Sequence, residues 1–342
     1  MKRNEFFSFI FLWAVVLVFW PTGVQAGQVL PQEPGFMVNV TPGKINVAIQ
    51  TLPFTVVIFP DTQMWSQSYP TRLTDSANWV VANKTTNNIK FVIQVGDIVN
   101  VNEQPYQWDN ANAGFSILDG EVPYCFAVGN HDMQSGLPPA PAWLPEPTRD
   151  TTNYNNTFPY TRYENEPWYG GRMLNDVFVP SDNYDNFYHF FTVGNLEFMI
   201  ISLSIAPTDA ILTWADGIVA ANPNKRIIFV THSYMSGSTR LSSDQYAPQA
   251  SDANFGEQMW QKFVKTHENI FLVPCGHLAE GRRTDMNDFG KPVHQFVNNS
   301  DWLRILRFVP DENKIDVTSY RPWSDEYATG TANQYELSYE MN

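Results

Sequence analysis

Residues able to bind a metal follow short apolar runs at several separate places in the sequence. They are Asp61, Gln63, Asp97, Asn130, His232 and His277, with His131 and Asp132 directly after Asn130. Carboxylate, amide and imidazole groups of this mix suit hard or borderline divalent cations better than soft cations that prefer thiolates. Two such cations sharing one carboxylate can hold a phosphoryl group and generate hydroxide at neutral pH. Asp97 lies centrally in the order and is the natural shared ligand.

The apolar runs before these residues have the composition of buried parallel strands. The runs in the first half are residues 54–59, 90–95 and 122–128, with apolar residues at helical spacing over 73–81 and 108–118 between them. This alternation predicts a parallel sheet with right-handed crossovers. Ligands of open α/β sheets lie at the carboxyl ends of the strands, so the polar residues should meet at one rim. Glycines before Asp97, Asn130 and His277 permit the tight turns needed there.

Regular patterns resume after a long irregular stretch. Residues 133–185 are rich in Pro, Asn, Tyr and Trp without a clear period, which is typical of a functional loop region. The second half predicts a hairpin over 187–193 and 196–203, helices over 210–221 and 256–267, strands over 226–230 and 270–274, a closing hairpin over 303–309 and 314–320, and a last strand over 334–339. We therefore predict one domain over 53–342, preceded by a lead-in over 27–52.

The order of these motifs resembles that of the calcineurin-like metallophosphoesterases, from residue 54 to about residue 340. Asp61-Thr-Gln63, Gly-Asp97, Gly-Asn130-His131-Asp132, His232 and Gly-His277 carry the resemblance, and the first motif is similar to that of a secreted branch of the family. The resemblance implies a mixed α/β fold, a four-layer α-β-β-α sandwich of two mixed sheets, with two divalent metal ions (Mn, Fe or Zn) between the sheets.

The resemblance also implies roles for individual residues. Asp61, Gln63 and Asp97 would hold one metal, and Asp97, Asn130, His232 and His277 the other. His131 would donate a proton or hydrogen bond to the leaving-group oxygen, supported by Asn100 and Asp132. Asp132 is expected to brace its loop through backbone hydrogen bonds rather than touch metal.

The sequence departs from the family pattern at two positions. The family's usual Gly-His-x-His ending is here Gly-His277-Leu-Ala279, and Ala279 has no ligand atom, so one metal site should be weak unless Glu280 replaces the missing histidine. Asn100 stands where an Asp often orients the catalytic histidine. Arg282 and Arg283 follow the last motif and are candidates for substrate phosphate, with a surface salt bridge as the alternative.

The N-terminus predicts export. Lys2 and Arg3 precede an apolar run over residues 6–20, and Val24-Gln-Ala26 matches a small-residue cleavage site. These features are typical of a signal peptide over residues 1–26, because the run is shorter than a membrane-spanning helix requires. We therefore expect a secreted or periplasmic protein without stable membrane insertion, and a retained membrane anchor is the alternative.

The net charge bears on the class of binding partner, and the two cysteines bear on the core. The net charge of −14 argues against nucleic acid as a binding partner, because such binding needs a basic surface. Cys125 and Cys275 lie in apolar runs and are expected to be buried thiols.

The sequence favours a metal-dependent phosphoesterase, either phosphatase or phosphodiesterase, acting on a small phosphate ester. A non-catalytic or mononuclear binding protein on the same fold is the alternative, because of Ala279.

Overall fold

The computed structural model describes residues 29–32, 36–41, 44–49, 51–134, 149–174 and 183–341. The predicted signal segment and part of the irregular stretch lie outside these residues. The chain divides into two compact units, residues 1–50 and 51–342. In the first unit, β1 (Val29–Gln32), β2 (Phe36–Thr41) and β3 (Lys44–Ile49) form an antiparallel sheet in that order, which the sequence analysis did not predict.

The second unit begins with the predicted alternation of strands and helices. Its elements are β4 (Phe54–Phe59), α2 (Gln63–Ser68), α3 (Pro70–Asn83), β5 (Ile89–Gln94), α4 (Pro105–Phe115) and β6 (Tyr124–Phe126). The three strands are parallel. Continuous burial along β4 agrees with its sequence, which is apolar except for Thr55. The last of these strands is shorter than predicted.

Antiparallel strands from the end of the chain complete this first sheet. They are β16 (Leu303–Val309), β17 (Lys314–Arg321), β18 (Glu326–Ala328) and β19 (Tyr335–Ser338). The sheet order is β18-β17-β16-β4-β5-β6, and β19 also pairs with β17. The closing hairpin predicted from the sequence is therefore confirmed, and it pairs with β4 through β16.

The second sheet has the order β14-β15-β13-β10-β9-β8-β7. Its strands are β7 (Tyr169–Arg172), β8 (Phe187–Val193), β9 (Leu196–Ser202), β10 (Arg226–Val230), β13 (Ile270–Cys275), β14 (Gly281–Met286) and β15 (Pro292–Val297). The inner strands β9, β10, β13 and β15 are parallel. The hairpin of β8 and β9 and the strand β10 match the sequence prediction.

Shorter elements connect or flank the strands. They are α5 (Thr152–Thr157), α6 (Asp209–Ala220), α7 (Gly256–Met259) with a π turn over Trp260–Val264, the two-stranded ribbon β11 (Met235–Ser236) and β12 (Thr239–Arg240), and 3₁₀ turns at Ser116–Leu118, Tyr160–Arg162 and Pro310–Glu312. No helix among the described residues combines the length and the apolar character that crossing a bilayer requires.

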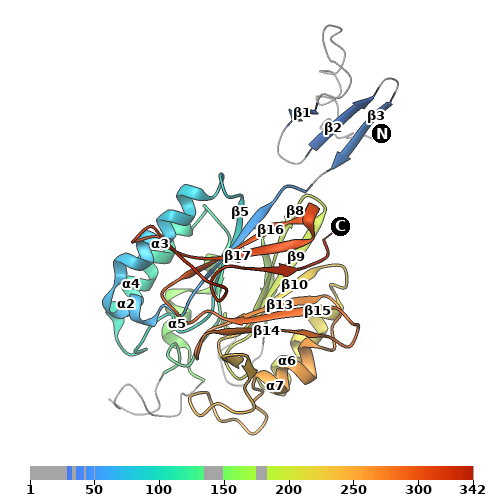
Figure 1. Ribbon diagram of the computed structural model, residues 1–342. Helices are drawn as coiled ribbons and strands as arrows, with labels where there is room; N and C mark the ends of the chain where they lie inside the picture. Colours follow the sequence, from blue (N-terminus) through green and yellow to red (C-terminus); the bar gives the residue numbers. More distant parts are fainter. Residues whose placement is uncertain are drawn as a thin grey trace, which may run out of the picture. The chain divides into compact units, whose positions relative to one another are not determined.

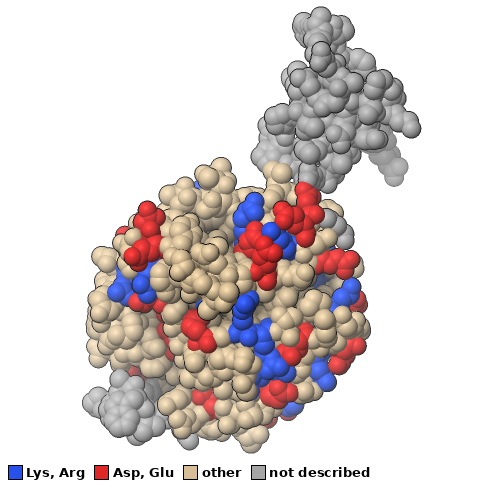
Figure 2. Space-filling model, viewed as in Figure 1, with Lys and Arg blue, Asp and Glu red and all other residues tan. Residues whose placement is uncertain are grey.

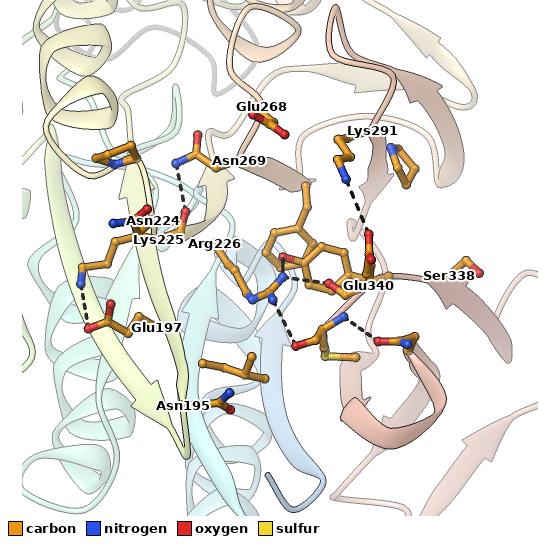
Figure 3. A pocket seen from close by; sticks show the side chains of 17 residues that line it. Asn195, Glu197, Asn224, Lys225, Arg226, Glu268, Asn269, Lys291, Ser338 and Glu340 are labelled. Carbon is orange, nitrogen blue, oxygen red and sulfur yellow. Dashed lines mark hydrogen bonds and ion pairs between the residues drawn. The ribbon is translucent and has the colours of Figure 1, made fainter. Parts of the chain in front are cut away.

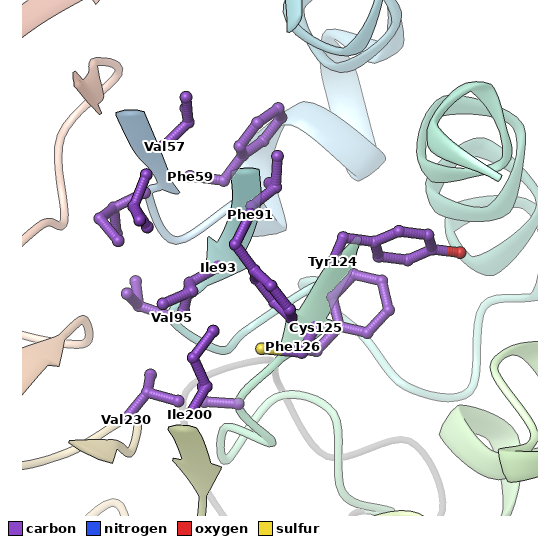
Figure 4. Packing of buried hydrophobic residues seen from close by; sticks show 14 of the residues in the cluster. Val57, Phe59, Phe91, Ile93, Val95, Tyr124, Cys125, Phe126, Ile200 and Val230 are labelled. Atoms are coloured by element: carbon purple, nitrogen blue, oxygen red, sulfur yellow. The ribbon is translucent and has the colours of Figure 1, made fainter. Parts of the chain in front are cut away.

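The two sheets face each other and the helices cover their outer faces (Figure 1). Aromatic contacts join the sheets: the Phe54 ring centroid lies 4.6 Å from that of Phe308 in its own sheet and 5.4 Å from that of Phe198 in the other. Figure 4 shows Ile200 and Val230 of the second sheet beside side chains of β4, β5 and β6. Cys125 and Cys275 are buried free thiols, as expected. The predicted four-layer α-β-β-α sandwich is confirmed.

Candidate metal centre

The candidate ligands come from the carboxyl ends of parallel strands in both sheets. Asp61 follows β4, Asp97 follows β5, Asn130 follows β6, His232 follows β10 and His277 follows β13. The carboxyl ends of parallel strands meet at one edge of each sheet, and the two sheets are stacked. Asp97, His232 and His277, which are far apart in the sequence, therefore come together at this edge.

The backbone at this edge is in unusual conformations. Asp97 has a φ of 54° and His277 a φ of 74°, in the left-handed region that residues with side chains rarely adopt. Glycine is needed beside them: a Cβ on Gly129 would lie 2.1 Å from Asp97 Oδ1, and a Cβ on Gly96 would lie 2.5 Å from His232 Nδ1. The predicted tight turns therefore bring backbone and ligand side chains into direct contact.

Asp97, His232 and His277 form a cluster in which one potential ligand atom of each lies within 4.8 Å of the others. Asp97 Oδ2 lies 2.9 Å from His232 Nε2, and the side chains are 1% and 0% exposed. Two ligands bound about 2.1 Å from one cation at right angles would be about 3.0 Å apart, so this separation fits two ligands of the same ion. The other oxygen, Oδ1, accepts the backbone N–H of His131 at 2.9 Å.

Several ligand atoms are buried without a hydrogen-bond partner. Gln63 Oε1, Asn130 Oδ1 and His232 Nε2 are in this condition, and the group beside His232 Nε2 is the fellow candidate ligand Asp97. Buried polar atoms are nearly always satisfied, and an unsatisfied one costs roughly 1–3 kcal/mol. Because these atoms belong to residues predicted as ligands, bound cations would satisfy them. The residues present therefore fit a metal site.

The remaining atoms of these side chains are held in place. His232 Nδ1 lies 2.8 Å from the carbonyl oxygen of Val95, which leaves Nε2 free to bind metal. Gln63 donates its side-chain N–H to Asp61 Oδ2 at 3.3 Å and its backbone N–H to Asp61 Oδ1 at 3.1 Å, so its Oε1 faces away from that carboxylate. A main-chain carbonyl thus orients His232, and the neighbouring candidate ligand Asp61 orients Gln63.

The electrostatics of the site favour a cation. Burial and the charge of Asp97 raise the pKa of Asp61 well above its usual value. Burial opposes ionisation of Asp97, but His232 and His131 hold its pKa below the usual value. Burial lowers the pKa of His232, yet Asp97 and Asp61 raise it to about 9. This crowding of carboxylates thus favours bound protons in the metal-free protein. A divalent cation would replace those protons.

Asp132 braces the loops around the centre. Its Oδ1 accepts the backbone N–H of Ile98 at 2.7 Å and of Val99 at 3.2 Å, and its Oδ2 accepts that of Gly129 at 2.9 Å. Burial and the charge of Asp97 raise the pKa of Asp132 to about 7, although these backbone donors favour its ionised form. The side chain joins the loop after β5 to the loop after β6, as expected from the sequence.

His131 is oriented differently from the prediction. Its Nδ1 lies 2.6 Å from the backbone carbonyl oxygen of Asn100, whereas the Asn100 side chain donates to Gln67 Oε1 at 3.0 Å. The Asn100 side chain, expected in the place of an orienting Asp, does not contact His131. The physical reason is that a main-chain carbonyl supplies the acceptor, so residue type at position 100 does not decide the orientation.

The position of the missing histidine is not filled by Glu280. Ala279 is exposed, and its carbonyl oxygen accepts the N–H of Gly237 at 2.8 Å. The Glu280 carboxylate accepts the backbone N–H of Asn299 at 2.7 Å and pairs with Arg304 Nη2 at 2.6 Å. Both of its oxygens are therefore engaged away from the cluster.

Comparison with known proteins agrees with this geometry. The family model of the calcineurin-like phosphoesterases matches residues 54–281. The chain belongs to the calcineurin-like phosphoesterase family. The region that matches the family model runs from β4 to the start of β14 and so includes every candidate ligand. Membership of this family and the fold support a metal-dependent phosphoesterase.

Two individual proteins are similar to this chain, one in sequence and one in structure. An uncharacterized protein of Bacillus subtilis, YvnB, is 26% identical over 334 residues, which is 88% of this chain and 23% of that protein. The chain thus spans about a quarter of the length of this curated relative. A purple acid phosphatase from yellow lupin seeds is similar in structure, with a TM-score of 0.53 and 14% identity over 89% of this chain and 59% of that one. The latter likeness shows the fold alone.

Arg282 and Arg283, the candidates for binding substrate phosphate, contact other groups of this chain. The Arg282 guanidinium lies 3.9 Å from the ring centroid of Tyr335. Arg283 makes a bidentate pair with Asp285, at 2.6 Å and 2.8 Å, and donates to the carbonyl oxygen of Ser238. The pair of Arg283 with Asp285 is the salt-bridge alternative, whereas Arg282 makes a cation–π contact, and a role of either in phosphate binding stays a prediction.

Asp244 is a residue near the centre that sequence reasoning missed. It lies in the loop after β12, its side chain is 2% exposed, and its Oδ2 is 3.0 Å from His277 Nε2. Burial opposes its ionisation, but His277 and Ser233 hold its pKa below the usual value. Asp244 follows no apolar run and belongs to no motif, so only the folded loop reveals it.

A cavity of about 800 Å³ lies away from this centre, at the amino ends of β10 and β13. Figure 3 shows two ion pairs in its lining, Lys225 with Glu197 and Lys291 with Glu340. Arg226 donates to Tyr339 Oη and to the carbonyl oxygens of Glu340 and Met341. Arg226 and Lys291 thus hold residues 339–341 against the second sheet.

Proposed function

We propose that this chain is a secreted phosphoesterase that hydrolyses small phosphate esters at a site for two divalent cations. The observation that carries the proposal is the set of buried, unpaired ligand atoms on Gln63, Asn130 and His232, together with the cluster of Asp97, His232 and His277. Membership of the calcineurin-like phosphoesterase family supports the same conclusion.

The candidate ligands divide into two sets that share Asp97. Asp61, Gln63 and Asp97 would hold one cation, and Asp97, Asn130, His232 and His277 the other. Divalent cations bound there would neutralise the phosphoryl oxygens and lower the pKa of water to near neutrality. The protein's own part is to keep these side chains converged in a buried site, where electrostatic interactions are stronger than in water.

His131 is proposed to serve the leaving group. Its Nδ1 donates to the carbonyl oxygen of Asn100 at 2.6 Å, which fixes the ring and leaves Nε2 as the free nitrogen. The backbone N–H of the same residue is bound to Asp97 Oδ1, so the ring is held beside the metal centre. A proton on Nε2 can then pass to the departing ester oxygen.

The surface does not supply a general attraction for phosphate. The net charge is −14, and Figure 2 shows acidic and basic side chains interspersed on the face it presents. Positive charge for the substrate must then come from the site itself, which agrees with a requirement for cations. Small esters that enter the centre are favoured over polyanionic macromolecules.

Metal analysis combined with an ester assay tests this proposal. The full mature chain is assayed for bound metal and for hydrolysis of a chromogenic phosphomonoester and phosphodiester, with and without a chelator. We expect bound divalent metal and hydrolysis that the chelator abolishes and added Mn²⁺ restores. Bound metal without turnover of any ester in a broad panel would favour the binding-protein alternative, which Ala279 supports. Export is tested separately by the mass of the protein recovered outside the cytoplasm, expected to begin after Ala26.

A further inference from the structure

Asp244 connects the two histidines of the candidate metal centre. Its Oδ2 accepts the hydroxyl of Ser233, the residue after His232, at 2.5 Å and lies 3.0 Å from Nε2 of His277. The rings of His232 and His277 have centroids 5.0 Å apart. A single buried carboxylate therefore contacts one candidate ligand directly and the neighbour of another.

The loop around Asp244 holds this carboxylate firmly. Oδ1 accepts the backbone N–H of Tyr246 at 2.9 Å, and Gln249 donates its side-chain N–H to the Asp244 carbonyl oxygen at 2.7 Å. With its side chain 2% exposed, the carboxylate has lost its water. Burying a charge in this way is costly unless it is paired, so the contact with His277 compensates for the burial.

Asp244 itself stands outside the cluster of ligand atoms. Within the described part of the chain, the group whose atoms lie within 4.8 Å of one another consists of Asp97, His232 and His277. Asp244 touches that group through His277 Nε2. Metal-binding histidines usually give their second ring nitrogen to a carboxylate or carbonyl, which fixes the tautomer that binds. His232 shows this arrangement with the carbonyl oxygen of Val95.

We propose that Asp244 is a positioning residue for the metal centre: it accepts the Nε2–H of His277 and so leaves Nδ1 of that ring for the cation. The proposal rests on the proposed metal site but not on the reaction. The role matters here because the usual second histidine is replaced by Ala279, and Glu280 is engaged by Arg304 and Asn299. His277 is then the last imidazole of the motif, in a left-handed backbone conformation, and needs support from another element.

The variant Asp244→Asn separates positioning from a merely structural role. The N–H of Tyr246 requires an acceptor, so the Asn oxygen should occupy the Oδ1 position and the amide nitrogen should face Nε2 of His277. That amide would donate to Nε2 and favour the tautomer protonated on Nδ1. In this tautomer Nδ1 has no lone pair to give to a metal. A nearly isosteric change should therefore weaken metal binding as much as Asp244→Ala does.

Titration of the full mature protein with Co²⁺, followed by its visible absorption, is the test. We expect Asp244→Ala and Asp244→Asn each to weaken Co²⁺ binding by about 10–100-fold, as loss of such partners does elsewhere. The control Glu280→Gln alters a neighbouring carboxylate that does not contact His277 and should leave affinity unchanged. Thermal unfolding of metal-free Asp244→Asn should match that of the unmodified protein. In ¹⁵N spectra of the neutral metal-free ring, the proton of His277 should move from Nε2 to Nδ1 in this variant.

The outcomes distinguish this inference from the proposed function. Unchanged Co²⁺ affinity and an unchanged tautomer in Asp244→Asn would overturn the positioning role, even if the unmodified enzyme hydrolyses esters. Weakened binding in both Asp244 variants would support it, even if no ester is turned over. An unmodified protein that binds no Co²⁺ would overturn both proposals.

Discussion

The imidazole of His131 is held by the main chain of Asn100, whose carbonyl oxygen lies 2.6 Å from Nδ1. This contact gives the ring its orientation without using the Asn100 side chain, which donates to Gln67. The residue type at position 100 should therefore matter little to the orientation of His131.

Replacing His131 with Ala should lower kcat by about 10²–10⁴-fold, the usual contribution of a general acid. Metal content should be largely retained, because the ring is not part of the Asp97, His232 and His277 cluster. The loss should be smaller for esters with good leaving groups, such as nitrophenolate. Steady-state rates with a series of leaving groups provide the measurement, and an equal loss across the series contradicts the general-acid role.

Asn100→Ala is the matched control for this prediction. The variant keeps the carbonyl that holds His131 and removes only the side-chain contact with Gln67. We expect kcat to change by less than about tenfold, well below the loss in His131→Ala. A loss as large as that of His131→Ala would show that the Asn100 side chain acts on the reaction after all.

Asp97→Asn should abolish activity and lower metal content at both sites. Asp97 presents Oδ2 to His232, and its Oδ1 accepts the His131 backbone N–H, so an amide here would lose charge at the centre of the cluster. Even residues that only support a ligand contribute 10–100-fold, so the loss should exceed about 100-fold. Metal analysis and the ester assay check this together. Full metal content with a near-normal rate would rule out Asp97 as the shared ligand.

Much of the fold could be predicted because its strands are continuously apolar. The run 54–59 is wholly buried, and its strand bounds match the prediction. The third strand was predicted over 122–128, but its bounds are Tyr124–Phe126, flanked by single backbone hydrogen bonds from Val92 to Pro123 and from Ala127 to Gln94. The edge strand Gly281–Met286 was missed because alternate side chains are exposed and most are polar. Edge strands need little apolar sequence to form.

The candidate site was predictable where a ligand directly follows a strand. Asp61, Asp97, Asn130, His232 and His277 meet that condition, and each strand end has a recognisable turn. Asp244 and the carbonyl of Asn100 could not be predicted. The former lies on a long loop whose path only tertiary packing defines, and the latter is a main-chain group that every residue carries. Supporting contacts of this kind leave no pattern in a sequence.

Metal affinity should rise with pH. His232, with a pKa of about 9, and Asp61, with a raised pKa, hold protons in the metal-free protein that a cation must displace. Each displaced proton makes the apparent affinity increase about tenfold per pH unit, and the increase should cease above about pH 9. Calorimetric titration with Mn²⁺ in two buffers of different ionisation enthalpy measures the protons released. An affinity that stays constant between about pH 6 and pH 9 contradicts this view of the site.

The two proposed metal sites should differ in affinity. The site of Asp61, Gln63 and Asp97 has an amide oxygen and no imidazole, whereas the other site has His232 and His277. Neutral oxygen ligands bind zinc or iron less well than imidazole does, while manganese and magnesium tolerate them. The protein should therefore purify with about one tightly held ion per chain, and added Mn²⁺ should increase activity. Metal analysis before and after dialysis, with activity measured against Mn²⁺ concentration, provides the test.

Variants at the end of the last motif test the reason for this difference. Ala279→His restores an imidazole where the family usually has one and should tighten the weak site, raising occupancy toward two ions. Glu280→Ala should leave occupancy unchanged, because the carboxylate is engaged by Arg304 and Asn299 rather than by the cluster. A fall in occupancy in Glu280→Ala would mean that this loop rearranges to bring Glu280 onto the metal. Two tightly held ions in the unmodified protein, unaffected by Glu280→Ala, would show that Gln63 and its neighbours suffice without the missing histidine.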